Sequence, residues 1–148
     1  MKKFKANDNK NEEHEINYRQ FNKKLELLNQ ILSLISDINQ ASDEKEVKDC
    51  IPALLQYTGE YTDADRVYIF ELMSEKQDYY SNTFEWCRKG IIPQIDNLIR
   101  ISADSMPVWH EKFLRGETII IHDLEKIRET MPLEYDILKV QDVHSLLV

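Results

Sequence analysis

The chain has 148 residues, of which 42% are hydrophobic and 31% are charged. A length near 150 predicts one domain with a sizeable core, and the apolar fraction is too high for a disordered chain. The net charge of −8 argues against a general nucleic-acid binder or a protein of anionic membrane surfaces. The sequence contains no stretch of about 18 apolar residues, no signal-peptide core in residues 1–15 and only two distant cysteines. We therefore expect a cytoplasmic protein.

The N-terminal region divides into a polar part and an amphipathic part. Residues 1–15 contain little to bury and predict a disordered tail. Residues 16–40 predict a long helix that carries two apolar stripes. The first stripe has the 4-3-4-3 spacing of a coiled-coil seam and consists of Phe21, Leu25, Leu28, Leu32 and Ile35. The second consists of Leu27, Ile31, Leu34 and Ile38.

Two adjacent stripes make a face too wide for a lone helix to bury. One interpretation is a core helix of its own domain. The interpretation favoured here is a parallel dimer helix that also packs on its own domain. The seam covers only about three heptads, which is short for an isolated coiled coil.

A second helix and a hairpin follow. Ser42, followed by the acidic residues Asp43 and Glu44, is predicted to be the N-cap of this helix, and Pro52 predicts a kink near residues 48–52. Residues 66–73 predict a strand covered on both faces. In residues 79–88 apolar and polar side chains alternate, which predicts a half-buried partner strand. Residues 66–88 are therefore expected to form a hairpin.

The remaining elements are short. After an apolar connection, Asp104 or Ser105 is expected to cap a short helix with Pro107 in its first turn. Residues 118–122 predict a strand, Pro132 opens another helix, and residues 143–148 form an apolar run with β character. The expected fold class is α+β.

The sequence shows no catalytic constellation. The four histidines lack metal-ligand spacing, the three glycines cannot build a phosphate loop, and no nucleophile elbow is present, so we expect no metal, no cofactor and no enzymatic activity. The aromatic residues Phe84, Trp86, Trp109 and Phe113 predict either core packing or a ligand cavity. Asp123 predicts either a helix cap or an acceptor at a pocket rim.

Several stretches together resemble a known family. DADRVYIFEL at 63–72 resembles the entry into the first strand of a GAF domain. The stretches at 84–102, 106–127 and 132–148 are similar to GAF domains of bacterial signalling proteins, which are commonly joined to diguanylate cyclase (GGDEF), phosphodiesterase (EAL) or histidine kinase modules. The resemblance covers about residues 40–148 and is specific as a combination.

The resemblance implies an antiparallel sheet flanked by helices, with residues 41–148 as a sensory domain. It implies a ligand cavity between the sheet and the segment 89–142, with Trp86, Trp109, Phe113 and Asp123 on or near it. The helix 16–40 would form a homodimer and relay the binding of a small molecule or partner to a linked output domain. Three departures stand out: Pro52 interrupts a helix, no chromophore-attaching cysteine is present, and the family's last strands and helix would lie beyond Val148.

Two other functions were weighed. A ligand-free dimerisation or structural module would have a filled core with no cavity. A GAF-fold methionine sulfoxide reductase would need several cysteines that converge on one pocket, and the chain offers only Cys50 and Cys87.

Overall fold

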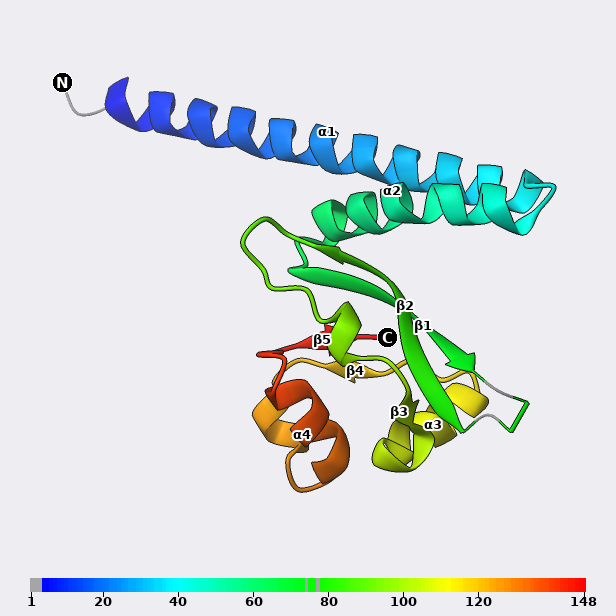
Figure 1. The fold of residues 1–148 in the computed structure, drawn as a ribbon. Coiled ribbons are helices and arrows are strands. Elements are labelled where there is room, and N and C mark those ends of the chain that lie inside the picture. Colours follow the sequence, from blue (N-terminus) through cyan, green and yellow to red (C-terminus); the bar gives the residue numbers. More distant parts are fainter. Residues whose placement is uncertain (1–3, 74, 77) are drawn as a thin grey trace. The chain divides into compact units, whose positions relative to one another are not determined.

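The computed structural model describes the backbone of residues 4–73, 75–76 and 78–148 (Figure 1). Helices and small sheets alternate along the chain, which confirms the predicted α+β class. The residues form two compact units. The helical unit holds residues up to 68 and residues 84–93, and the mixed unit holds 69–83 and 94–148.

In the helical unit, α1 (Phe4–Gln40) and α2 (Glu44–Thr62) lie side by side, joined by a three-residue turn (Figure 1). Residues 4–15, for which the sequence predicts a disordered tail, belong to α1. This segment contains neither proline nor glycine, so nothing in it stops the helix. At 1.5 Å per residue, α1 is about 55 Å long and α2 about 28 Å.

The two stripes of α1 have different surroundings. Leu27 is 7% exposed, and Ile31, Leu34 and Ile38 are half-buried, on the side of α1 that packs on α2. The stripe that starts at Phe21 is largely exposed. The prediction that the helix packs on its own chain with one stripe therefore agrees with the structure.

Helix α2 is held at its start by a side-chain cap. The N-cap is Asp43 and not the predicted Ser42, because the Oδ1 of Asp43 accepts a hydrogen bond from the N–H of Glu46 at 2.9 Å. The Glu46 carboxylate in turn accepts from the N–H and the hydroxyl of Ser42, at 2.8 and 3.0 Å. This reciprocal arrangement explains why the acidic run began a helix. Pro52 lies within α2, which continues past it to Thr62.

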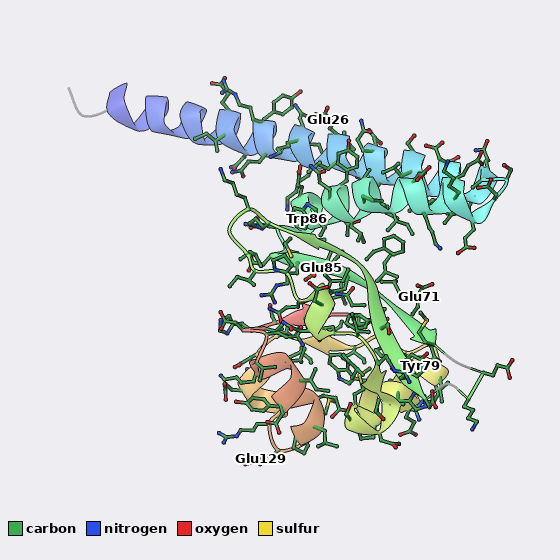
Figure 2. The ribbon with its side chains drawn as sticks, viewed as in Figure 1. Glu26, Glu71, Tyr79, Glu85, Trp86 and Glu129 are labelled. Carbon is green, nitrogen blue, oxygen red and sulfur yellow. The ribbon has the colours of Figure 1, made fainter. Side chains whose placement is uncertain are left out.

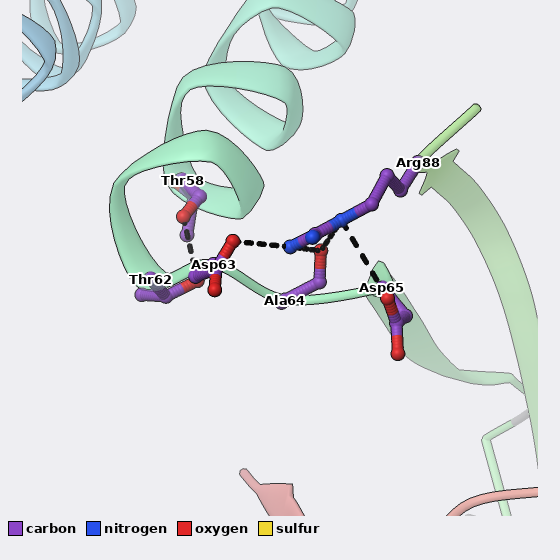
Figure 3. A network of polar contacts seen from close by, with 6 residues as sticks. All are labelled: Thr58, Thr62, Asp63, Ala64, Asp65 and Arg88. Atoms are coloured by element: carbon purple, nitrogen blue, oxygen red, sulfur yellow. Dashed lines mark hydrogen bonds and ion pairs between the residues drawn. The ribbon is translucent and has the colours of Figure 1, made fainter.

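Arg88, which follows strand β2 (Tyr79–Cys87), bonds to the turn between α2 and β1 (Arg66–Met73). The Arg88 guanidinium donates to the carbonyl of Ala64, pairs with Asp63 at 2.7 Å, and lies 3.5 Å from Asp65 (Figure 3). Asp63 has a left-handed backbone with φ of 59°, and its N–H donates to Gly59 to end α2.

Strands β1 and β2 are neighbours, which confirms the predicted hairpin, and β3 (Ile101–Ser102) pairs antiparallel with β2 in the order β1-β2-β3. The start of β2 is more buried than expected, because Ser81 and Asn82 are buried as well as Tyr80. Ser81 accepts a hydrogen bond from the N–H of Arg100, and Asn82 donates its N–H to Leu98. The long connection after β2 therefore covers the strand.

The mixed unit contains the short elements. Helix α3 (Pro107–Leu114) and helix α4 (Pro132–Lys139) both begin at a proline, as predicted. Strand β4 (Ile120–Ile121) pairs antiparallel with β5 (Leu146–Leu147) in a separate two-stranded sheet. Short 3-10 turns at Ile95–Asn97, Ala103–Ser105 and Leu124–Ile127 complete it. The core contains Tyr80, Ala103, Met106, Trp109, Ile119, Ile121, Leu124, Tyr135 and Leu138.

The helical unit joins helix α2 and the segment 84–93 to α1, because α1 buries its second stripe on α2. Among the described residues, none of the helices combines the length and the apolar character needed to cross a bilayer.

Candidate functional site

Among the residues whose side chains the structure describes, a long exposed apolar surface is formed by the first stripe of α1 and by Tyr18, which continues its spacing. We call this surface the α1 seam: Tyr18, Phe21, Leu25, Leu28, Leu32 and Ile35. Phe21 is 65% exposed, Leu32 55% and Ile35 42%, and only Leu28 is half-buried. At 100° per residue these side chains lie within one narrow sector of the helix surface. A continuous apolar seam of this length in water marks an interaction surface.

Helix α1 also extends well beyond α2. Lys24 lies 5.9 Å from the ring centroid of Tyr61, which is next to the last residue of α2. The N-terminal half of α1 therefore runs past the end of its neighbour (Figure 1). Residues 14–20 are all exposed. Within the helical unit, α2 thus covers only the C-terminal half of α1.

Trp86 packs on α2. A methyl group at residue 59 would lie 2.1 Å from Cζ3 of Trp86, so the indole rests directly on the backbone of α2 at Gly59 (Figure 2). Phe84 and Trp86 belong to the helical unit, whereas Trp109, Phe113 and Asp123 belong to the mixed unit. The structure thus does not gather the five predicted ligand-binding residues into one compact unit.

Trp109 and Phe113 belong to the core of the mixed unit. Their rings meet edge to face with centroids 6.1 Å apart, and Phe113 makes a similar contact with Tyr80 at 5.7 Å. Trp109 is 8% exposed. These contacts support core packing, which was one of the two interpretations of the aromatic residues. The Nε1 of Trp109 has no hydrogen-bond partner among the described residues.

Asp123 acts as a cap. Its Oδ1 accepts a hydrogen bond from the N–H of Glu125 at 3.1 Å at the start of the 3-10 turn Leu124–Ile127. Its carboxylate also lies 3.8 Å from Lys126. Of the two interpretations of Asp123, the contacts fit the cap.

A shallow hollow of about 420 Å³ lies between the segment that precedes α3 and the end of α4. Its wall combines apolar side chains with amide and hydroxyl groups. The apolar residues are Leu98, Ile101, Ile137 and Val140, and the polar ones are Gln94, Asn97, Ser105 and Gln141. All of these residues fall inside the segment 89–142 that the family resemblance implied for a ligand cavity. None of the five predicted ligand-binding residues lines it.

A second hollow, of about 540 Å³, is polar. The guanidinium of Arg100 stacks on the ring of Tyr79 at 4.3 Å, and the imidazole of His110 shares a 2.8 Å hydrogen bond with Tyr80. Lys76 and Arg100 are balanced at its rim by Asp78 and Asp104. With nearly equal numbers of both charges, this hollow does not select an anion or a cation.

The thiol of Cys87 is not activated. Burial, together with the neighbouring carboxylate of Glu85, raises the pKa of the Cys87 thiol to about 11. A reactive thiol needs a lowered pKa, so Cys87 is a poor nucleophile. Within the part of the chain that the structure describes, no three His, Cys, Asp or Glu side chains come together as metal ligands.

A structural residue that sequence reasoning missed is Glu134. It is 2% exposed, and its Oε1 accepts hydrogen bonds from the N–H groups of Val108 and Trp109 at 2.8 and 3.3 Å. The prediction that Asp104 or Ser105 caps α3 is therefore wrong. The N-cap position is Met106, whose side chain has no oxygen, and the capping carboxylate is that of Glu134 in α4. The only sequence signal was an acidic residue in the first turn of α4, which looks like an ordinary dipole partner.

Neither a protein-family model nor a curated protein matches this chain.

Proposed function

We propose that this chain is a non-enzymatic regulatory module, of the GAF type that its sequence resembles, which pairs with a second copy through the α1 seam. One observation carries the proposal. Helix α1 has two apolar stripes, and only one of them is covered by its own chain. An exposed, coiled-coil-spaced stripe is self-complementary, because two identical seams can interlock.

The sensory part of the proposal rests on the hollow beside α4. Its mixture of apolar walls and amide groups suits a small polar organic molecule. A ligand held there would change the dimer only if it bound two packing states with different affinities. A linked output domain, such as a diguanylate cyclase or a histidine kinase, would receive that change through α1.

A ligand-free dimerisation module is the second candidate. The observation that favours it is the aromatic core, in which Trp109 and Phe113 pack on each other and on Tyr80. Thermal unfolding in the presence of nucleotides and metabolites separates the two candidates. A bound ligand raises Tm with its concentration, and Ile137→Trp, which fills the hollow, should abolish the rise. A screen in which no compound raises Tm favours the ligand-free module.

Dimer formation is tested by sedimentation equilibrium. Leu32→Glu places a charge in the α1 seam and should convert a dimer into a monomer. Ser33→Glu is the matched control, because residue 33 is exposed on the same helix but lies outside the seam. A monomeric wild-type protein, or a dimer that survives Leu32→Glu, would contradict the proposal.

A further inference from the structure

We propose that the second copy docks on the α1 seam in the antiparallel direction, and not in the parallel direction expected from the sequence, with the two-fold axis crossing α1 between Glu26 and Leu27. This inference rests on the proposed dimer and adds the orientation and the register of its partner. Two features of the exposed seam favour this orientation: the order of side-chain sizes along it and the polar residues at its two ends.

In an antiparallel pair, residues at equal distances from the two-fold axis meet. Around this axis Tyr18 faces the partner's Ile35, Phe21 faces the partner's Leu32, and Leu25 faces the partner's Leu28. The large aromatic side chains of one end thus meet the smaller aliphatic side chains of the other. All six are on the exposed side of α1 or half-buried, so each is available for such a layer.

A parallel pair would match each residue with its own copy. Tyr18 and Phe21 would then stack on themselves at one end, while Leu32 and Ile35 did so at the other. The distance between packed helices follows the side chains at the contact, about 8–10 Å. A parallel pair would therefore be wedged apart at the aromatic end. The antiparallel pairing gives layers of similar size and an even spacing.

The polar ends of the seam fix the register. His14 and Asn39 continue its spacing outwards, and both are exposed. In the proposed register they face each other at the two ends of the interface. A shift of seven residues would instead place Asn39 on Phe21, or His14 on Leu32. Because a buried polar group without a partner is costly, the unshifted register is favoured.

Disulfide trapping tests the orientation. In a Cys50→Ala, Cys87→Ala background, two variants carry Tyr18→Cys or Ile35→Cys. In the antiparallel pair residue 18 lies about 26 Å along the axis from its own copy, because 17 residues rise about 1.5 Å each. A disulfide needs Cα atoms within about 7 Å. Each single variant should stay uncrosslinked under mild oxidation, whereas the two variants co-expressed should form a mixed covalent dimer.

The outcomes separate this inference from the dimer itself. Self-crosslinking of each single variant, with a dimer in sedimentation, would overturn the antiparallel orientation and keep the dimer. A dimer in which neither the single nor the mixed variants crosslink would overturn the seam as its interface. A monomer in every experiment would overturn the proposed dimer as well. Ser33→Cys co-expressed with Tyr18→Cys is the control and should give no crosslink.

Discussion

The buried carboxylate of Glu134 offers a sharp test of how the mixed unit is held together. Glu134→Ala removes the acceptor that caps α3 and leaves the N–H groups of Val108 and Trp109 without it. A hydrogen bond to a charged group contributes about 1.5–3 kcal/mol, and loss of a helix cap costs about 0.5–2 kcal/mol. These two figures describe the same contacts, so they are not added.

We expect Glu134→Ala to lower the free energy of unfolding by about 2 kcal/mol, because relief of the carboxylate's own burial offsets part of the loss. Glu134→Gln keeps an oxygen in place but loses the charge. Since charge-assisted hydrogen bonds are roughly twice as strong as neutral ones, this variant should lose about 1 kcal/mol. The order wild type, Gln, Ala is the signature of the cap.

Urea unfolding followed by tryptophan fluorescence measures these differences, and Trp109 lies at the site. With a slope of about 2 kcal/mol per molar urea, Glu134→Ala should move the midpoint down by about 1 M. The matched control is Asp136→Ala, an exposed residue of the same helix, which should change stability by less than about 0.5 kcal/mol. A Glu134→Ala midpoint equal to that of Asp136→Ala would refute the cap.

Three other substitutions test contacts in the helical unit. Gly59→Ala should destabilise by about 1–3 kcal/mol in urea unfolding, because its methyl group would overlap the Trp86 ring. Arg88→Met should cost about 1 kcal/mol, since it removes the guanidinium that donates to the Ala64 carbonyl as well as exposed ion pairs that are weak by themselves. In a Cys50→Ala protein, alkylation of Cys87 at pH 8 should be about 100-fold slower than that of an unfolded thiol, and should rise about tenfold per pH unit towards a pKa of about 11.

Each of these has a control and a contrary outcome. Gln56→Ala, exposed on α2, and Lys89→Met, exposed next to Arg88, should both stay within about 0.5 kcal/mol of wild type. If Gly59→Ala or Arg88→Met unfolds at the same urea concentration as its control variant, the contact that it removes contributes nothing to stability. The same cysteine variant unfolded in urea supplies the reference alkylation rate, and a native rate within tenfold of it would contradict a raised pKa.

Elements whose signal is local could be predicted from the residues of one segment. Helix and strand periods of 3.6 and 2 residues repeat over a few turns, so the long helix, the second helix and the hairpin were readable. Proline at a first helical turn marked the starts of α3 and α4. The two stripes of α1 were also visible, because they are a property of one segment alone.

The contacts that each surface makes became known from the three-dimensional structure. It covered Leu27 and left Phe21 exposed, it set Trp86 on Gly59 within the helical unit, and it brought Glu134 to a helix that begins 27 residues earlier. The sequence offered Trp86 and Trp109 as partners because both are large and apolar. Apolar side chains pack without direction, so composition cannot tell which of them will meet, and packing between distant segments leaves no period in the sequence.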